Sequence, residues 1–551
     1  MTRDELIERT RQLVAEGDRL EVSPSLGALQ VWLKLSDDLL VEAWGSMDRY
    51  HLSWLMVGKP KSIVRGRPMT AEEEAAYVRE VAAAKTAALR MSLDAVERQG
   101  MPFRGEDGGV APGQGMGEVP LRGLTIRGRV PAVGGQASVP APDPIARDYL
   151  LLALRLDQLI PGLVDAYFGP ADLKARVDLE PLASPARLLD DARALLAQVP
   201  GEVADPMRER WLTAQLVALE TQTRALAGDP LPYRDHVARC FDFEPERRSE
   251  ALFAASAAAI GELLPGDDPI DERLAAWDAR FTIPVDRLPA FADVLVARYR
   301  ERALALFGAP DGDSLRVGLV TGQPWTGYNW YDGSYRSRVD LNTDVPLRVA
   351  SAARTLAHET YPGHHLEHAW KDAARVQDAG EVEASALLIN APECLISEGL
   401  AEIGYGIVVP PEDEVNLLVE LFGVAGLPIA ADLPAARDAA DRSVAIERQR
   451  HVLRAVAVNA ALMRHVDDVG HDDVLAYLRT VGLMAPDRAA QRLSFIEHPL
   501  WRTYVFVYTE GEELLQRWLD LDTAEGRTAR FGRLLRESLT PGSIAEDVVA
   551  G

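Results

Sequence analysis

The repeated helical spacing of apolar residues is the feature that most limits what this chain can fold into. Long segments rich in Ala, Leu, Arg and Glu place apolar residues three or four positions apart, and Gly and Pro fall at their ends; examples are residues 71–99, 209–228 and 443–466. This period matches one face of an α-helix. Alternating β-branched runs, which are typical of strands, are scarce. We therefore expect a mainly α fold built as a large helical body.

The overall charge argues against a nucleic-acid partner. The chain has 551 residues with 59 Lys and Arg against 84 Asp and Glu, a formal net charge of −25, and such a field repels phosphate backbones. No apolar run approaches the roughly 18 residues of a membrane-spanning helix, and the charged first residues do not resemble a secretory signal. Cys240 and Cys394 are expected to be free thiols. We expect a cytoplasmic protein without a membrane or nucleic-acid partner.

A stretch rich in glycine and proline interrupts the helical pattern. Residues 102–144 contain ten Gly and seven Pro, a composition typical of a linker, a lid or a flexible insertion. Within it, 124–130 is a candidate short strand. The GQGMG at 113–117 lacks the preceding strand and the following helix of a nucleotide-binding fingerprint, so we assign it no ligand. We expect an N-terminal helical region at 1–101, then this linker, then a helical domain at 145–551.

A second non-helical segment lies at 315–345. It combines β-branched and aromatic residues with several turn-forming residues, and we expect two or three short strands there. A helical pattern follows. Pro346 suits its first turn.

This helical segment contains most of the candidate metal-binding and catalytic residues. Four of the ten histidines fall within eleven residues, and Glu359 follows the first of them: they are His358, His364, His365 and His368. In zinc peptidases of the His-Glu-x-x-His type, two histidines at i and i+4 share a helix face and bind the metal, and the glutamate activates water. Position 362 is proline here, so that spacing is absent.

An ideal helix would not bring these histidines together. His364 would lie about 120° around the axis from His358, and His365 would share its face about 10 Å further along. The Pro362–Gly363 pair offers a remedy, because proline disfavours helical geometry and glycine relaxes the backbone. A two-residue bulge there would return His364 to the face of His358. We then expect His358 and His364 to be metal ligands and Glu359 to be the general base.

The octapeptide HETYPGHH at 358–365 resembles the signature of a bacterial family, domain-of-unknown-function family 885. Its members are similar in fold to zinc carboxypeptidases of the thermostable carboxypeptidase Taq type. The resemblance is strongest over 315–515. It implies a deep cleft in the helical body and a small β-hairpin or sheet beside the metal helix. It also implies that Gly363–His364 ends the metal motif and that Glu398, in SEGLAEIGYG, is the third ligand.

The same resemblance implies further site residues. A Tyr-x-x-Gly element near the C-terminus corresponds to Tyr508 and Gly511, so Tyr508 is expected to stabilise an oxyanion or to hold substrate. The hairpin at 328–342 would lie beside the cleft, with an edge that could pair with an extended peptide. The expected substrate-binding residues are Tyr328, Asn329 and His365.

Other residues compete for these roles. His364 and His368, at i and i+4, form a rival metal pair that would leave His358 without a role. Four carboxylates compete with Glu398: Glu381, Glu383, Glu393 and Glu402. Four arginines are candidates for binding a substrate carboxylate: Arg336, Arg338, Arg354 and Arg502.

Two imidazoles and one carboxylate would leave a fourth position for water on Zn²⁺. The metal would lower the pKa of that water towards about 7, and Glu359 would take its proton. We expect a zinc-dependent metallopeptidase-like hydrolase that cleaves amide bonds of short peptides. The alternatives are a non-catalytic metal- or ligand-binding helical protein on a peptidase scaffold, and a hydrolase of non-peptide amides or esters.

Overall fold

The computed structural model describes residues 3–44, 54, 70–97, 103, 139–321, 323 and 325–550. Contacts within the chain divide it into two units, residues 1–120 with 319–326 and residues 121–318 with 327–551. Most of the predicted linker, including the GQGMG sequence and the candidate strand at 124–130, lies outside the described residues. The predicted boundaries at 101 and 144 therefore stay predictions.

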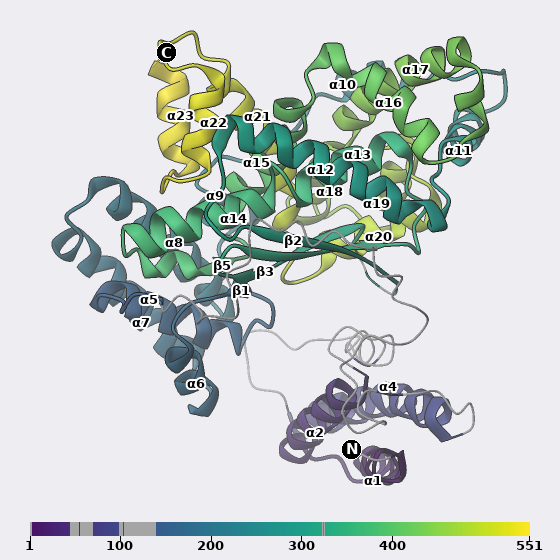
Figure 1. Cartoon of the computed structure of the whole chain (residues 1–551). Helices are drawn as coiled ribbons and strands as arrows, with labels where there is room; N and C mark the ends of the chain where they lie inside the picture. The colour runs from purple at the N-terminus through teal and green to yellow at the C-terminus, as the bar shows by residue number, and fades with distance from the viewer. Residues whose placement is uncertain are drawn as a thin grey trace. The chain divides into compact units, whose positions relative to one another are not determined.

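Helices of the first unit pack around a small apolar core. They are α1 (Arg3–Val22), α2 (Leu26–Trp44) and α4 (Ala71–Glu97), coloured purple to blue in Figure 1. Leu20, Trp32 and Val78, one from each helix, are almost fully buried and belong to one hydrophobic cluster. The helix predicted at 71–99 is confirmed over Ala71–Glu97, and residues 98 and 99 lie outside the described residues.

The second unit is also mainly helical, as predicted. In chain order its α-helices are α5 (Pro144–Asp157), α6 (Ala171–Leu179), α7 (Pro185–Glu202), α8 (Pro206–Leu226), α9 (Tyr233–Phe241), α10 (Glu250–Leu263), α11 (Ile270–Arg280), α12 (Leu288–Phe307), α13 (Val349–Glu359), α14 (His364–Lys371), α15 (Pro392–Val408), α16 (Pro411–Val424), α17 (Leu433–Leu453), α18 (Val456–His465), α19 (His471–Thr480), α20 (Pro486–Glu497), α21 (Val507–Leu519), α22 (Arg527–Leu534) and α23 (Pro541–Ala550). The predicted helix at 209–228 corresponds to α8. The predicted helix at 443–466 is instead divided between α17 and α18.

Several helices begin where a short polar residue precedes proline. Asp143 before α5 and Asp205 before α8 each accept hydrogen bonds from backbone N–H groups of the first turn. Ser184 does the same for α7. Such caps satisfy N–H groups that have no partner within the helix, and proline at the first position gives up no hydrogen bond.

The segment predicted to hold two or three strands forms a three-stranded sheet. Its strands are β2 (Ser314–Val320), β3 (Gly327–Gly333) and β4 (Arg336–Asn342), in the order β2-β4-β3. β3 and β4 pair as an antiparallel hairpin, with Asn329 opposite Val339. Helices α13 and α14, which carry the histidine cluster, pack against β3. A smaller sheet pairs β1 (Val164–Tyr167) with β5 (Ala386–Leu388) in antiparallel fashion.

Pro346 does not lie in a first helical turn as predicted, because the chain stays extended to Arg348. Arg348 forms a β-bridge with Thr282, and the Ile283 N–H donates to the Leu347 carbonyl at 2.8 Å. This pairing delays the start of α13 until Val349.

A large hydrophobic cluster in the second unit is built mainly from α5, α7 and α8, and Ala386 and Leu388 of β5 complete it. Both cysteines are free thiols, as predicted. Among the described residues, none of the helices combines the length and apolar character that crossing a membrane requires.

The buried His236 on α9 makes stability depend on pH. Its side chain is 6% exposed and its Nδ1 atom has no hydrogen-bond partner. Burial, reinforced by the charge of Arg502, lowers the pKa of His236 from 6.5 to about 4. Between these values the unfolded chain binds a proton that the folded chain does not, so the free energy of unfolding falls as the pH falls. We expect the free energy of unfolding to fall by about 2 kcal/mol between pH 7 and pH 5 because of His236.

Urea unfolding at the two pH values measures this loss, and His236→Phe is expected to remove most of it. His471→Gln, a change at an exposed histidine, controls for the loss of any histidine. An unchanged pH dependence in His236→Phe would contradict the assignment.

Candidate metal centre

The helix predicted to carry the histidine cluster is broken in two. α13 ends at Glu359 and α14 begins at His364, so Thr360–Gly363 forms a non-helical turn between them. The Tyr361–Pro362 peptide bond in this turn is cis. The prediction of a two-residue bulge within one continuous helix is therefore wrong. The chain instead ends one helix and starts a second.

Gly363 allows the second helix to start directly against the end of the first. A Cβ atom at this position would lie 1.9 Å from the carbonyl oxygen of His358 and 2.7 Å from that of Ala357. The Gly363 N–H also donates a hydrogen bond to the Ala357 carbonyl at 3.1 Å. A larger residue would have to push the two helix ends apart, and glycine is the residue that permits such a close backbone approach.

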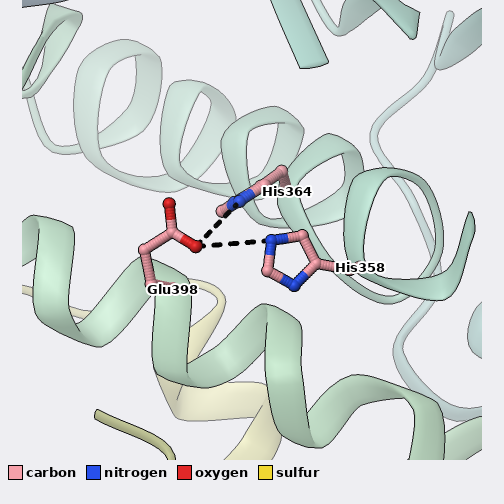
Figure 2. A group of neighbouring side chains, drawn as sticks. All are labelled: His358, His364 and Glu398. Carbon is pink, nitrogen blue, oxygen red and sulfur yellow. Dashed lines mark ion pairs between the residues drawn. The ribbon is translucent and has the colours of Figure 1, made fainter. Parts of the chain in front are cut away.

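This turn brings the imidazoles of His358 and His364 together beside Glu398. The two ring centroids are 4.7 Å apart with the planes at 88°. Oε2 of Glu398 lies 3.3 Å from Nε2 of His358 and 3.7 Å from Nε2 of His364, as Figure 2 shows. The side chains of His358, His364 and Glu398 keep 14%, 12% and 10% of their surface exposed, respectively. The three predicted metal ligands thus form one group that could hold a cation.

Glu398 is positioned by the close packing of its helix, α15, against α21. A Cβ on Gly399 would lie 2.5 Å from the carbonyl carbon of Gly511, and one on Gly511 would lie 2.3 Å from the carbonyl oxygen of Leu395. The two backbones therefore touch at a pair of glycines. Gly511 is the glycine of the predicted Tyr-x-x-Gly element, and its place in the structure is this contact.

The two carboxylate oxygens of Glu398 have different surroundings. The Tyr504 hydroxyl donates a 2.5 Å hydrogen bond to Oε1. Oε2 is buried, makes no hydrogen bond, and lies within ion-pair distance of both imidazoles. The charge of this buried oxygen is therefore balanced by the two rings. Imidazole nitrogens and a carboxylate oxygen are ligands that Zn²⁺ accepts, so these residues fit the metal that the sequence predicted.

The outer nitrogens of both imidazoles also face polar groups. Nδ1 of His358 lies 3.6 Å from Oε1 of Glu402. Nδ1 of His364 lies 3.2 Å from the hydroxyl of Ser397. Metal-binding histidines commonly direct the second ring nitrogen at a carboxylate or another polar group, which orients the ring.

The charges around the cluster favour a positive species between the rings. Burial alone lowers the pKa of His364, but Glu367 and Glu398 outweigh it and hold this pKa well above its ordinary value. The pKa of His358 is likewise raised, because its contact with Glu398 outweighs burial. Burial alone raises the pKa of Glu398, but both histidines outweigh it and hold this pKa far below its ordinary value. A site that stabilises positive charge in this way also suits a cation.

Glu359, the predicted general base, lies at the end of α13 beneath the start of β3. Its side chain is buried, and burial raises its pKa, while His358 and His364 act in the opposite direction. A Cβ on Gly327 would lie 3.1 Å from Oε1 of Glu359 and 2.9 Å from the Thr355 side chain. Gly327 therefore leaves room for the carboxylate.

A rival group formed by His364, Glu367 and His368 is also close enough to hold a metal. The rings of His364 and His368 stack at 5.6 Å. Glu367 is already engaged, because Lys371 pairs with its Oε1 at 2.7 Å and Ser397 donates to its Oε2 at 2.6 Å. A metal there would sit next to the Lys371 ammonium. Nδ1 of His368 is also buried without a hydrogen bond, so it is the Lys371 ammonium beside Glu367 that favours the first group.

A third group, formed by Glu402, His451 and Glu512, already surrounds a cation of the protein. Arg454 lies 2.8 Å from Glu402 and 3.1 Å from Glu512. We assign no metal to this group.

The carboxylates predicted to compete with Glu398 all pair with basic side chains. Lys371 pairs with Glu393 at 2.7 Å and Arg375 with Glu381 at 2.9 Å. Arg208 pairs with Glu383 at 2.6 Å, and Arg454 holds Glu402. Glu398 faces two histidines instead.

His365 points away from the cluster. Its ring is fully buried, with Nδ1 2.8 Å from the Ser337 hydroxyl and Nε2 2.7 Å from Oδ1 of Asp313. Both ring nitrogens are therefore engaged by the protein. The predicted contact of His365 with substrate finds no support in this geometry, and its position links α14 to the three-stranded sheet.

The other predicted residues lie nearer the cluster. Asn329 donates from Nδ2 to the backbone carbonyl of Glu359 at 2.8 Å, so it anchors the end of α13. The Tyr328 hydroxyl donates to Asp165 on β1. Tyr508 packs edge-on against Tyr504 at 5.6 Å, and burial together with the charge of Glu398 raises its pKa. Their roles towards substrate stay predictions. Two of the arginines predicted to bind a substrate carboxylate form ion pairs, Arg338 with Asp340 and Arg354 with Glu414.

Sequence reasoning missed three residues of this site: Tyr504, Ser397 and Glu367. Tyr504 lies in the same aromatic segment as Tyr508, one helical turn earlier. Only the contact with Glu398 distinguishes the two. Glu367 lies three residues after His364, a spacing that places both on neighbouring positions of one helix. This spacing could have predicted that Glu367 lies beside His364.

We expect Gly363→Ala to separate the two imidazoles and to lower the free energy of unfolding by more than about 3 kcal/mol, because the new Cβ atom meets backbone atoms. Zinc affinity should fall with it. Gly406→Ala on α15, where an added Cβ atom meets nothing within 4 Å, is the matched control. That change should shift stability by no more than about 1 kcal/mol. Native zinc affinity in a folded Gly363→Ala protein would contradict the role of this turn.

We expect His358→Ala and His364→Ala each to abolish zinc binding, whereas His368→Ala retains it. The reason is that only the first two direct Nε2 at Glu398. Elemental analysis of protein purified without chelator gives the stoichiometry, and competition with a zinc-sensitive dye gives the affinity. Loss of zinc in His368→Ala with retention in His358→Ala would establish the rival group instead.

Comparisons with known proteins give little further guidance. No family model matches this chain, and no curated protein matches its sequence. A solved structure from Colwellia psychrerythraea, described as a "putative lipoprotein", aligns with a TM-score of 0.39 and 14% sequence identity over 67% of each chain. A likeness this weak carries no argument about fold or function.

Proposed function

We propose that this protein is a zinc-dependent hydrolase that cleaves amide bonds of short peptides. The observation that carries the proposal is the buried Oε2 of Glu398, which makes no hydrogen bond and lies within ion-pair distance of Nε2 of both His358 and His364. The resemblance of HETYPGHH to the signature of domain-of-unknown-function family 885 stays part of this proposal, because no family model matches the chain. Bound there, Zn²⁺ would act as a Lewis acid towards water and a carbonyl oxygen.

The protein's own residues supply the remaining steps. The Glu359 carboxylate takes a proton from the attacking water and passes it to the nitrogen of the leaving amine. A carboxylate with a raised pKa suits such a base, because it binds the proton more readily than an ordinary glutamate does. Tyr508 is our candidate for a donor to the oxygen that gains negative charge.

The position of β3 favours an extended substrate. β3 is at the edge of the three-stranded sheet and packs against α13, which carries His358 and Glu359. An edge strand has backbone groups free to pair with an added strand. A peptide bound along β3 would place its backbone beside the cluster, and Trp330 on this strand is 38% exposed.

We expect Glu359→Gln to retain zinc but to lower peptide hydrolysis by about 10²- to 10⁴-fold, because the amide cannot accept the proton. A library of short peptides, analysed by mass spectrometry, measures the activity and elemental analysis measures the metal. Glu220→Gln, which changes a buried glutamate on α8 paired with Arg193 and Arg239, is the control.

Two results would contradict the proposal. Hydrolysis that persists in Glu359→Gln would exclude Glu359 as the base. Wild-type protein that binds zinc but cleaves no peptide in the library would favour the non-catalytic metal-binding alternative.

A further inference from the structure

We propose that Ser397 is a positioning residue that fixes the tautomer and orientation of His364, so that Nε2 of this histidine is free to bind a cation. The inference rests on the proposed zinc-binding function, which it extends from the ligands to the residue behind one of them. Ser397 immediately precedes Glu398 on α15, and it lies well inside this helix, which begins at Pro392.

The hydrogen-bond pattern around Ser397 fixes the direction of each bond. Its hydroxyl lies 2.6 Å from Oε2 of Glu367 and 3.2 Å from Nδ1 of His364, and it bridges these two atoms, which are themselves 3.6 Å apart. A hydroxyl has one proton to donate, and an ionised carboxylate can only accept. The Ser397 proton therefore goes to Glu367, and the Ser397 oxygen must accept from Nδ1–H of His364. A neutral His364 then carries its proton on Nδ1 and a lone pair on Nε2.

Glu367 is held in the ionised form that this pattern requires. It has no exposed surface, and Lys371 pairs with its Oε1 at 2.7 Å. Lys371 also pairs with Glu393 at 2.7 Å, and Arg375 pairs with Glu393 at 3.1 Å. Buried negative and positive side chains thus alternate from Arg375 to Glu367, and Glu367 is the carboxylate that accepts the hydrogen bond from Ser397. Ser397 thus connects a fixed anion to one ring of the candidate metal centre.

The neighbouring histidine provides an internal comparison. His365 also directs Nδ1 at a serine hydroxyl, that of Ser337 at 2.8 Å. Its Nε2, however, faces Asp313 inside the protein. The two histidines therefore have similar serine contacts, but only the contact of His364 lies behind a nitrogen that faces Glu398.

The test compares zinc affinity in full-length wild type, Ser397→Ala and Ser397→Thr, measured by competition with a zinc-sensitive dye. We expect Ser397→Ala to weaken zinc binding by about 10- to 100-fold, the usual effect of losing a hydrogen bond behind a ligand. Ser397→Thr keeps the hydroxyl and should restore most of the affinity. Ser337→Ala removes the comparable serine behind His365 and should leave zinc affinity unchanged.

A spectroscopic readout separates positioning from a purely structural role. In zinc-loaded protein labelled with ¹⁵N-histidine, the Nδ1 proton of His364 should exchange slowly with water in the wild type. It should exchange faster in Ser397→Ala, whereas Ser337→Ala leaves it unchanged. Unchanged zinc affinity and unchanged exchange in a folded Ser397→Ala protein would overturn the inference.

Failure of this inference can be told apart from failure of the proposed function. A wild type that binds zinc without cleaving peptides counts against the hydrolase alone, and the effect of Ser397 on affinity still stands. A Ser397→Ala protein that binds zinc like an active wild type counts against the positioning role alone. Absence of zinc binding in the wild type would overturn both.

Discussion

Direct contact between backbones is the constraint on which the candidate centre depends. Gly363 lies against the carbonyl group of His358, and Gly399 lies against Gly511. The first contact sets the distance between the two imidazoles, and the second sets the position of Glu398 relative to the C-terminal helices. No side chain fits at either contact, so the positions of the three candidate ligands are set by main-chain geometry, which is stiffer than a side-chain rotamer.

Charges buried near the centre are compensated within the protein. Lys371 and Arg375 are almost completely buried, and each pairs with two carboxylates. Removing one partner from such a set leaves an uncompensated buried charge, which is expensive. Glu398 is different because its Oε2 faces two imidazoles and no Lys or Arg side chain. This contrast identifies the candidate site more clearly than the number of acidic residues does, because the chain is rich in acidic residues throughout.

The sequence predicted the helical class from local periodicity, and it predicted the segment that forms the three-stranded sheet from β-branched, aromatic and turn-forming residues. It did not predict the short strands β1 and β5, which pair across a long stretch of chain. It also named His358, His364 and Glu398, the first two from their spacing around Pro362 and the third from a resemblance. The form of the helix break could not be predicted, because it depends on how closely Gly363 can approach the preceding turn. The late start of α13 was missed as well, since it depends on pairing between Arg348 and Thr282.

The contacts of Tyr504 and Ser397 could not be predicted from the sequence either, because they also join residues that are far apart along the chain. Tyr504 is separated from Glu398 by 106 residues, and Ser397 from Glu367 by 30. The residue type does not predict the contact in either case, because Tyr and Ser both occur in cores, in helices and on surfaces. The row of charges from Glu367 to Arg375 has helical spacing, yet its burial comes from elements far away along the chain.

Adjacent histidines on α14 face different neighbours, because consecutive residues of a helix lie about 100° apart around its axis. His364 faces α15 and Glu398, whereas His365 is bonded to Ser337 on β4 and to Asp313 ahead of β2. The short helix is therefore fixed from two directions, and the strands that bond His365 help to hold in place the backbone from which His364 projects.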